Sequence, residues 1–383
     1  MKFIEELDVT NKKVILRLDL NVTIKEGKIV DDTKIRKSIP TIKYLLNKGA
    51  NLLIMSHLGK VKTEEDKKEN TLLPVCNRLS ELLSMDIIFI KDTRDERIKD
   101  YLNDNRLVML ENTRHEDLPS SLESGCDDEL SKFWASLGDV FVNDAFGTTH
   151  RRHASNAGIA KYLPNGYGFL IKEELEGLDP IINNIERPFV VIMGGAKVDD
   201  KVALIESLIN KCDYILVGGG IANTFLKAKG YEVGESLYSK DYVDKIKVLI
   251  ENNINKIITP VDVVVKDNDS INTINIEEVS TTASIYDIGE KTCELYKQYI
   301  DNAATVFMNG TVGLYEDENY RHGTEFILKE LEQADCNKIA GGGDAVASVN
   351  KLGYENAFDF LSTGGGATLD YIASGKLKCY EVE

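Results

Sequence analysis

The sequence is poor in three features, and each absence excludes a class of protein. Basic residues are scarce: 46 Lys and Arg stand against 63 Asp and Glu, a formal net charge of −17, and such a field repels nucleic acid and anionic membranes. No apolar run approaches a membrane span, and the first residues have no signal-peptide core. The six cysteines show no C-x-x-C spacing, which argues against a zinc site or a disulfide framework. We therefore expect a cytoplasmic protein with no nucleic-acid or membrane partner.

The second half of the chain has glycine at the ends of its apolar runs. Glycine lacks a Cβ, so backbone N–H groups and the N-terminus of a following helix can come close to a large anion. Tight packing of a strand against a helix also uses glycine, but packing alone does not readily explain five such turns. We expect a phosphate-rich ligand at these turns. The runs are VVIMGG (190–195), YILVGGG (214–220), TVFMNG (305–310), KIAGGG (338–343) and FDFLSTGGG (358–366).

The first half carries cationic side chains at strand ends and in loops. Four of the five histidines fall in this set. The alternative reading is a series of solvated loop charges, but their shared placement after successive strands favours one convergent anion-binding patch. The residues are Arg17, Lys34, Arg36, His57, Lys60, Arg114, His115, His150, Arg151, Arg152 and His153.

Strand-like runs alternate with helical patterns through the first half. The runs are almost continuously apolar, which is typical of a parallel sheet covered by helices on both faces. The predicted strands are 14–20, 52–55, 87–90, 107–110 and 140–142. The predicted helices are 38–46, 72–83, 94–102 and 128–137.

A helical stretch at 167–183, ending near Asp179 and Pro180, has no glycine-lined strand before it and is interpreted as a connector. The glycine-ended units follow it, with a β-branched stretch at 257–265 and a polar, irregular stretch at 267–282. The predicted fold class is α/β, with two doubly wound, Rossmann-like parallel-sheet domains joined by a helix. The predicted boundaries are 1–166, 167–183 for the connecting helix, and 184–366.

Doubly wound domains bind ligands outside the carboxyl ends of their strands, so each half presents one anion site. This division suits phosphoryl transfer between a small anionic substrate and a nucleotide, because that chemistry needs positioning and charge neutralisation more than a base. Lys197 and Lys201 follow a glycine turn at i, i+4 spacing, so both can reach one side of a helix that starts nearby. Asp344 opens a predicted helix, where it could be an N-cap or a ligand of Mg²⁺.

With these residues in view, the chain resembles the phosphoglycerate kinase family along essentially its whole length. The resemblance implies an N-terminal domain that binds phosphoglycerate and a C-terminal domain that binds Mg-ADP or Mg-ATP. It also implies closure about a hinge helix, a tail at 367–383 that packs back on the N-terminal domain, and a monomer. The expected glycolytic reaction is reversible transfer between 1,3-bisphosphoglycerate and ADP, giving 3-phosphoglycerate and ATP without a covalent enzyme intermediate. The matching segments are LRLDLNV (16–22), MSHLG (55–59), LENTR (110–114), NDAFGTTHR (143–151), GGAKVDDK (194–201), VGGGIANTF (217–225), PVDVVV (260–265), NGTVGLYE (309–316), IAGGGD (339–344) and STGGGATLD (362–370).

The resemblance also implies a role for individual residues. In the first domain, Asp19 and Asn21 hold the glycerate, the phosphate faces His57, Arg114 and Arg151, and Arg17 supports the site. Lys34 and Lys60 complete the substrate-binding set, and Lys34 is also catalytic. The other implied catalytic residues are Lys197, Gly343 and Gly366, the last with Gly364 and Gly365 at a helix N-terminus aimed at the transferred group. The implied nucleotide-binding residues are Gly195, Lys197, Lys201, Gly219, Asn309, Glu316, Gly342, Gly343, Asp344 and Ala345, with Asp344 on the metal.

The departures from the family pattern cluster on phosphate contacts. The usual catalytic arginine aligns with Lys34, which is a point charge rather than a two-pronged donor. Losing one phosphate donor costs about 2–4 kcal/mol of transition-state stabilisation, or roughly 10² in rate, and Arg36 is a candidate to supply the missing donor. The other departures are Lys60 for Arg, Ala345 for Thr or Ser, Thr311 for Pro, Met308 for Trp, and the ending LKCYEVE (377–383).

These departures leave alternatives open. One is a catalytically impaired paralogue that binds nucleotide and a small phosphorylated acid, and another is a kinase for a different small carboxylate. A dinucleotide dehydrogenase is disfavoured because no G-x-G-x-x-G follows the first strand. Turnover at saturating substrates distinguishes a working phosphoglycerate kinase from an impaired paralogue. Trials of other acids distinguish it from a kinase for a different carboxylate.

Overall fold

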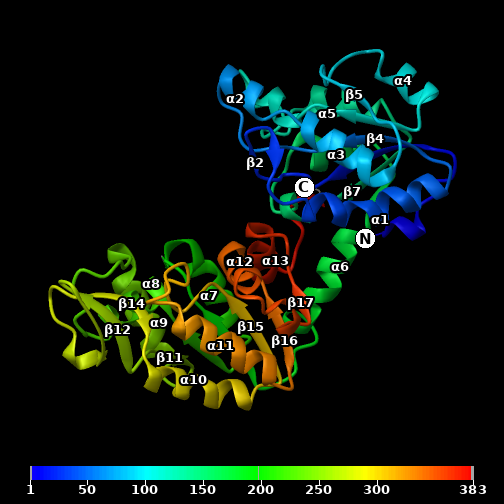
Figure 1. Cartoon of the computed structure of the whole chain (residues 1–383). Helices are drawn as coiled ribbons and strands as arrows, with labels where there is room; N and C mark the ends of the chain where they lie inside the picture. Colours follow the sequence, from blue (N-terminus) through cyan, green and yellow to red (C-terminus); the bar gives the residue numbers. More distant parts are fainter. Residues whose placement is uncertain (1, 197, 381–383) are drawn as a thin grey trace. The chain divides into compact units, whose positions relative to one another are not determined.

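The computed structural model describes residues 2–196 and 198–380. The chain divides into two compact units (Figure 1). Unit 1 runs to Leu175 and takes in the C-terminal segment from Leu377, and unit 2 is Glu176–Lys376. The sequence led us to place these boundaries at 166/167 and 366/367. The first observed boundary falls inside helix α6 (Phe169–Leu178).

Unit 1 is built on a six-stranded parallel sheet in the order β5-β6-β4-β1-β7-β8. Alternate residues of the central strand β1 point to opposite faces. Val14, Leu16 and Leu18 pack in one core with α1 and α3, and Ile15 packs in a second core with α4 and α5. Because both faces are buried, each strand reads as a continuous apolar run. The strands are β1 (Lys13–Leu18), β4 (Asn51–Met55), β5 (Ile88–Ile90), β6 (Leu107–Leu110), β7 (Val140–Asp144) and β8 (Asn165–Tyr167).

All five strands predicted for this half are present, and β8 is an additional one directly before the connecting helix. Helix α1 begins at Thr33, five residues before the predicted start, and continues through Pro40. Helix α4 begins only at Ile98, because the preceding residues form turns in which Asp92 and Asp95 accept backbone hydrogen bonds. The remaining elements of unit 1 are the hairpin β2 (Ile24–Lys25) and β3 (Lys28–Ile29), and helices α1 (Thr33–Asn47), α2 (Glu64–Glu69), α3 (Leu73–Leu83), α4 (Ile98–Asp104) and α5 (Asp128–Ala135).

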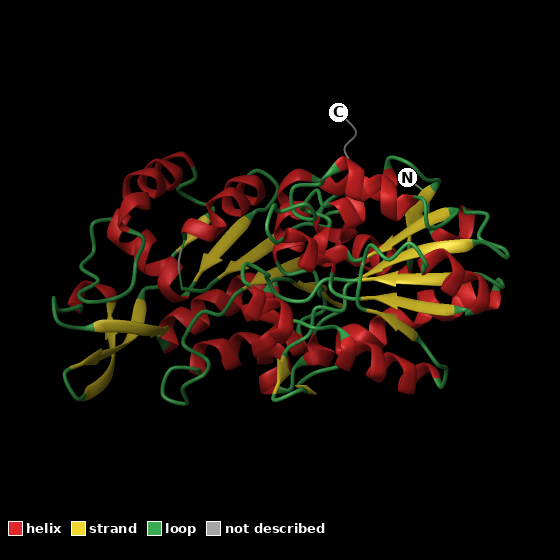
Figure 2. Ribbon diagram, turned by 90° about the horizontal axis from the view of Figure 1, so that it is seen from above, coloured by secondary structure: helices red, strands yellow, loops and turns green. Residues whose placement is uncertain are grey.

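Unit 2 has its own six-stranded parallel sheet, in the order β11-β10-β9-β15-β16-β17. Figure 2 shows, within each unit, strands that run between helices. The strands are β9 (Phe189–Met193), β10 (Tyr214–Val217), β11 (Ile257–Ile258), β15 (Thr305–Asn309), β16 (Asn337–Ala340) and β17 (Phe360–Leu361). The helices are α7 (Val202–Ile209), α8 (Gly219–Ala228), α9 (Val243–Asn252), α10 (Glu290–Asp301), α11 (His322–Gln333), α12 (Gly343–Leu352) and α13 (Gly366–Ser374).

Unit 2 also has a three-stranded antiparallel sheet that the sequence analysis did not predict. It consists of β12 (Asp262–Asp267), β13 (Ser270–Asn275) and β14 (Ser284–Ile288), in the order β13-β12-β14. The stretch 257–265, taken as one unit, is divided between β11 and β12 on either side of Pro260, which has no N–H to donate to a ladder. The stretch expected to be irregular contains β13, whose polar residues hid its strand character.

Short helical turns complete the fold. The described 3₁₀ turns are Ile4–Glu6, Thr113–Asp117, Phe146–Thr148, Asp179–Ile181, Asp199–Lys201, Lys240–Tyr242, Ile276–Glu278, Glu355–Ala357 and Lys378–Tyr380, and a π-helical turn spans Ala154–Gly158. Among the described residues, no helix combines the length and the apolar character that crossing a bilayer would require.

In each sheet the first strand is central, and the chain builds outward from it in both directions. Strand β1 lies between β4 and β7, with Arg17 opposite Met55 and Leu18 opposite Asp144. Strand β9 lies in the same way between β10 and β15. A parallel sheet of this kind opens a crevice beyond the carboxyl ends of its strands at the point where the order reverses. Each unit therefore has one such crevice.

Asp144, the last residue of β7, is a buried carboxyl group that links three elements. It accepts hydrogen bonds from Thr41 Oγ1 of α1 at 2.6 Å and from the backbone N of Ile171 in α6 at 3.1 Å. Burial nevertheless raises the pKa of Asp144 to about 6, because the loss of water outweighs these hydrogen bonds.

This raised pKa predicts a pH-dependent stability for unit 1. The folded state keeps the Asp144 proton to a higher pH than the unfolded chain, so ionisation costs stability as pH rises from about 4 to about 6. Relative to Asp144→Asn, the free energy of unfolding should fall by up to about 3 kcal/mol over this range. Trp134 is the only tryptophan and is fully buried in unit 1. Denaturant titrations that follow its fluorescence measure the difference in unfolding free energy between the wild type and Asp144→Asn. A difference that does not change with pH would contradict the prediction.

Candidate functional site

The loops after β1 and β4 and the first turn of α1 bring together one group of predicted residues in unit 1. Asp19 follows β1 and is 6% exposed, and Lys34 Nζ lies 2.9 Å from its Oδ2. Asn21 Oδ1 accepts a hydrogen bond from the backbone N of Gly59 at 3.0 Å, which ties the loop after β1 to the loop after β4. Lys60 follows directly and is exposed. Lys34 is thus held in place by a carboxylate while a third of its side chain stays exposed to solvent.

His57 lies among several cations. Arg17 Nη2 is 3.2 Å from its Nδ1, and Arg17 is fully buried, in keeping with a supporting role. Burial lowers the pKa of His57 well below its usual value, and the positive charges of Arg17, Arg114 and Lys34 lower it further. His57 is therefore neutral near pH 7, a state that sequence alone did not indicate.

The two predicted arginines of the later loops differ in burial. Arg114 is buried, with Nη1 2.7 Å from Asp117 Oδ2, and its Nε has no hydrogen-bond partner among the described residues. Arg151 is exposed, and its Nε donates to Nε2 of His150 at 2.8 Å. Arg114 is thus a fixed donor, whereas Arg151 is an exposed residue.

Arg36 does not join this group. It lies two residues beyond Lys34 on α1, and its Nε pairs with Asp32 Oδ1 at 2.8 Å. Arg78 of α3 pairs with the other oxygen of Asp32, also at 2.8 Å. Residues i and i+2 of a helix do not share a face, so these contacts do not favour Arg36 as the missing donor, and that role stays a prediction.

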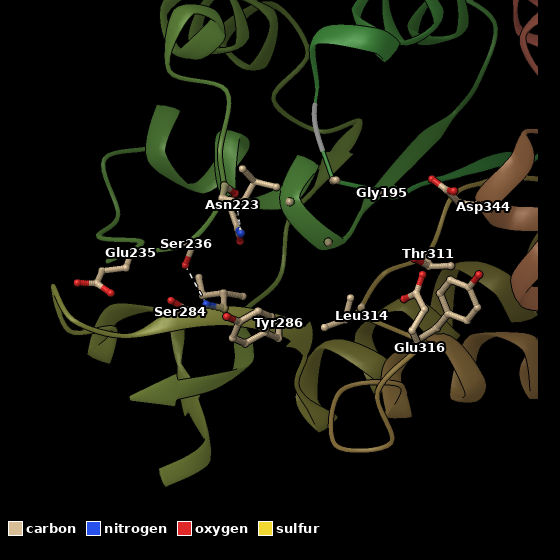
Figure 3. Close-up of a pocket in the computed structure, with 17 residues that line it drawn as sticks. Gly195, Asn223, Glu235, Ser236, Ser284, Tyr286, Thr311, Leu314, Glu316 and Asp344 are labelled. Atoms are coloured by element: carbon tan, nitrogen blue, oxygen red, sulfur yellow. Dashed lines mark hydrogen bonds between the residues drawn. The ribbon is translucent and has the colours of Figure 1, made fainter. Parts of the chain in front are cut away.

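Unit 2 contains a cavity of about 510 Å³ at its own sheet crevice (Figure 3). Four predicted residues line it: Gly195, Gly219, Glu316 and Asp344. Its other lining residues were not predicted, and many come from the loop before α9, from β14 and from the loop after β15. They are Ala196, Gly220, Asn223, Glu235, Ser236, Leu237, Ser284, Ile285, Tyr286, Thr311, Gly313, Leu314 and Tyr315.

Apolar side chains on the cavity wall are unusually exposed. Leu237 and Leu314 are 51% and 41% exposed, and Tyr286 is also exposed. Figure 3 shows Tyr286 and Leu314 between the end that carries Asn223 and Ser236 and the end that carries Glu316 and Asp344. Exposed apolar groups that converge on a cavity favour a flat, apolar ligand surface there. In the sequence they look like ordinary core residues.

The structure distinguishes glycines that allow loops to pack from glycines that leave a helix N-terminus open. A Cβ on Gly194 would lie 2.1 Å from the carbonyl O of Thr311, and one on Gly220 would lie 2.0 Å from that of Ala196. These glycines allow the loops themselves to pack, as the alternative reading held. Gly343 opens α12, is exposed, and would meet no atom within 4 Å. It leaves the helix N-terminus open to a ligand.

Lys197 lies outside the described residues. Lys201 is half-buried, and its Nζ donates to the carbonyl O of Gly194 at 2.6 Å and to that of Asn309 at 3.3 Å. Helix α7 begins only at Val202, so Lys201 does not lie on that helix, and the shared reach of Lys197 and Lys201 stays a prediction. Lys201 is instead positioned by the carboxyl ends of β9 and β15.

The first turn of α12 corrects another expectation. Gly342, with φ +97°, occupies the N-cap position, and Asp344 is the second helical residue. Asp344 is therefore not the N-cap, and its carboxylate is exposed on the cavity wall. Ala345 is fully buried in the core on that side of the sheet. Asn309 is 1% exposed, and its Nδ2 donates to the carbonyl O of Gly341 at 2.6 Å.

The last glycine run ends in the same way. Gly366 is the first residue of α13, and Gly365 precedes it with φ +55°. Helices α12 and α13 thus both begin at glycine directly after neighbouring strands, β16 and β17. The free N–H groups and the dipole of a helix N-terminus favour an anion.

Comparisons with known proteins agree along nearly the whole chain. The model of one family, described as phosphoglycerate kinase, matches residues 4–376. The phosphoglycerate kinase of Enterococcus faecalis is 47% identical over 380 residues, covering 97% of this chain and 96% of the relative. That of Fusobacterium nucleatum is 46% identical over 382 residues, with the same coverage.

Solved structures give the same result. The phosphoglycerate kinase of Coxiella burnetii is similar with a TM-score of 0.87 and 34% identity, covering 99% of this chain and 97% of that one. The enzyme of Pyrococcus horikoshii is similar with a TM-score of 0.83 and 30% identity, at the same coverage.

The contacts of Lys34 and Arg36 predict different effects on anion binding by unit 1. Lys34→Ala removes a charge that faces the patch, so the dissociation constant for 3-phosphoglycerate should rise about tenfold. Arg36→Ala is the matched control, because it removes a positive charge from the same helix, but one that pairs with Asp32. It should change the dissociation constant less than about twofold. Isothermal titration calorimetry measures both. Equal losses would show that Arg36 reaches the anion after all.

Proposed function

The chain belongs to the phosphoglycerate kinase family, and from this premise we propose that unit 1 binds the phosphoglycerate and unit 2 the nucleotide. The enzyme is a phosphotransferase of glycolysis that moves a phosphoryl group reversibly between 1,3-bisphosphoglycerate and ADP. The comparisons do not favour an inactive paralogue or a kinase for another acid. The observation that carries the division of labour is the contrast between the two crevices, one lined by side-chain cations and one by glycine-rich backbone.

In unit 1, the phosphate of the substrate meets the cations. Arg114, Arg151 and His57 supply N–H donors to the phosphate, and Lys60 adds a mobile charge nearby. Asp19 and Asn21 accept and donate hydrogen bonds at the glycerate end. The burial of Arg114 and of Asp19 supports this assignment, because a fixed donor or acceptor loses little freedom on binding.

In unit 2, the cavity accommodates a nucleotide from one end to the other. The apolar wall of Leu237, Tyr286 and Leu314 suits the faces of a purine, and Glu316 can accept hydrogen bonds from ribose hydroxyls. Gly195 and Gly219 allow the base to approach backbone. The phosphates then extend to Lys201 and to the N-termini of α12 and α13, with Gly342, Gly343, Ala345 and Gly366 in those turns.

Magnesium fits this site as an ion that arrives on the nucleotide. Among the described residues, no group of three or more His, Cys, Asp or Glu side chains could hold a metal by itself. Asp344 presents one exposed carboxylate on the cavity wall, and Mg²⁺ is commonly held by one or two carboxylates together with substrate phosphates. Bound there, Mg²⁺ would neutralise phosphate charge.

We further propose how the reaction is completed. The carboxylate of 3-phosphoglycerate and the γ-phosphoryl group must come into line, so the units close about a hinge at the connecting segment that contains α6. Lys34 and Lys197 then neutralise charge on the transferred group, and the glycine N-termini donate N–H groups to it. Both crevices belong to one chain, so the proposed reaction needs no second copy, and we propose a monomer. Its six free cysteines suit the cytoplasm.

The metal assignment predicts a selective effect of Asp344. Asp344→Asn should weaken binding of Mg-ADP about tenfold and leave binding of metal-free ADP within about twofold, because only the ion loses a ligand. Asp317→Asn removes an equal charge from the loop after β15, next to Glu316 but not on the cavity wall, and serves as control. Calorimetry with Mg²⁺ and with a chelator measures each. Equal weakening of both forms of ADP would exclude Asp344 as the ligand.

A coupled assay with purified protein, 3-phosphoglycerate and Mg-ATP tests the function and the role of Lys34 together. The wild type should turn over, and Lys34→Arg should raise kcat and kcat/KM by up to about tenfold. An arginine can keep one nitrogen on Asp19 and direct another at the transferred group, where charge develops. A slower Lys34→Arg variant would mean that the site is adapted to lysine, and absence of turnover in both would refute the proposed function.

A further inference from the structure

A buried polar chain lies directly beneath His57. Arg17, on β1, is fully buried and donates from all three nitrogens of its guanidinium. Its Nη1 donates to the carbonyl O of Leu18 at 2.5 Å, and its Nε donates to Ser155 Oγ at 2.9 Å. Its Nη2 lies 3.2 Å from Nδ1 of His57. A guanidinium with this many fixed partners has one orientation.

This contact determines the tautomer of His57. Arginine has only donors and stays protonated in proteins, so Nδ1 of His57 must be the acceptor and carries no proton. The ring proton of the neutral imidazole then lies on Nε2. Among the described residues Nε2 has no hydrogen-bond partner. It is nevertheless not one of the fully buried polar atoms that lack a partner, whereas Nδ1 of His153 is one. Nε2 is thus the nitrogen that His57 offers outward.

Glu123 holds the other end of the chain. It is fully buried and accepts hydrogen bonds from both the backbone N of Ser155, at 2.9 Å, and Ser155 Oγ. Since Ser155 donates its only hydroxyl proton to Glu123, its Oγ is free to accept from Arg17 Nε. The negative charge of Glu123 offsets part of the cost of burying Arg17, and Arg17 in turn opposes the rise that burial causes in the pKa of Glu123. Removing Ser155 takes away the partner of Nε, and removing Glu123 takes away the acceptor that orients the Ser155 hydroxyl. Either change loosens the guanidinium, which then keeps only the carbonyl O of Leu18 at 2.5 Å and Ser56 Oγ at 3.5 Å besides His57.

We propose that Glu123, acting through Ser155 and Arg17, fixes His57 as the neutral Nε2–H tautomer and so makes it a permanent hydrogen-bond donor to the phosphate of the substrate. Only the last step, contact with substrate, rests on the proposed function. Glu123, Ser155 and Arg17 are positioning residues, and His57 is the group that meets the ligand.

The surroundings of His57 explain why a neutral donor is useful. The charged or titratable groups that face it are Arg17 from β1, Lys34 from α1, Arg114 from the turn after β6, and His153 from the loop after β7. These groups are cationic or, for His153, neutral near pH 7, since burial lowers the pKa of His153 to about 3. A further positive charge on His57 would be repelled by them. The neutral N–H adds a donor without that repulsion.

Nuclear magnetic resonance of the full-length protein labelled with ¹⁵N-histidine tests the tautomer directly. Long-range ¹H–¹⁵N correlations distinguish Nε2–H from Nδ1–H, and His57→Gln assigns the signal among the five histidines. We expect a single Nε2–H form from pH 6 to pH 8 without ligand. A mixture of tautomers, an Nδ1–H form or a protonated ring at pH 7 would overturn the proposal.

Variants of Ser155 test the chain. Ser155→Ala should give a mixture of tautomers and raise KM for 3-phosphoglycerate about tenfold with kcat within about threefold, while Ser155→Thr, which keeps the hydroxyl, should restore both. Trp134 fluorescence verifies folding. If Ser155→Ala does not fold, Glu123→Gln replaces it with the same expectation. An unchanged Nε2–H form in the alanine or glutamine variant would overturn the positioning role.

The same spectra recorded with saturating 3-phosphoglycerate distinguish failure of this inference from failure of the proposed function. We expect the Nε2 signal of His57 to shift while the tautomer stays the same. If the tautomer is as expected but its signal does not respond, although the ligand binds, contact with His57 is refuted. If the tautomer is wrong while the enzyme turns over, the proposed function stands and the positioning chain fails.

Discussion

The geometry of the two central strands is the constraint on which the rest of the structure depends. Strands β1 and β9 each lie between neighbours that the chain reaches in opposite directions, so loops from distant parts of the sequence meet beyond their carboxyl ends. At β1 those loops bring Asp19, His57 and Arg114 to one place. At β9 they bring glycine turns and the first residues of α8 and α12. One topological rule therefore produces two sites with different chemistry, and the residues at the strand ends decide which anion each can hold.

Local electrostatics would allow this strongly acidic protein to bind the two anions that we propose. The cations of unit 1 are fixed by specific partners: Arg17 by Ser155, Arg114 by Asp117, and Lys34 by Asp19. Each partner restrains a donor, and the burial of Arg17 and Arg114 protects their interactions from screening by salt. In unit 2 the equivalent charge comes from backbone N–H groups at helix N-termini, which cannot be titrated. If the proposed assignment holds, we expect both sites to bind anions over the physiological pH range.

Sequence alone predicted five of the six sheet strands of unit 1 and the glycine turns at strand ends, because apolar periodicity and glycine report local backbone requirements. It did not predict features that depend on tertiary partners. Strand β13 is hidden by its polar residues, and in the sequence Leu237 and Leu314 resemble ordinary core residues. For Asp344 the sequence left an N-cap and a metal ligand open, and only the structure shows Gly342 in the N-cap position. Arg36 looked available in the sequence, but the structure shows that Asp32 holds it. These outcomes are decided by packing, which a single sequence does not display.

Hydrogen–deuterium exchange of the full-length protein with each ligand alone tests the central claim, that each crevice holds one ligand. With 3-phosphoglycerate, protection should be confined to the strand-end loops of unit 1, around 19–21, 57–60 and 112–115. With Mg-ADP it should be confined to unit 2, around 194–196, 218–220 and 311–316. Protection by 3-phosphoglycerate in the unit 2 cavity, or by Mg-ADP in the cationic patch of unit 1, would contradict the account.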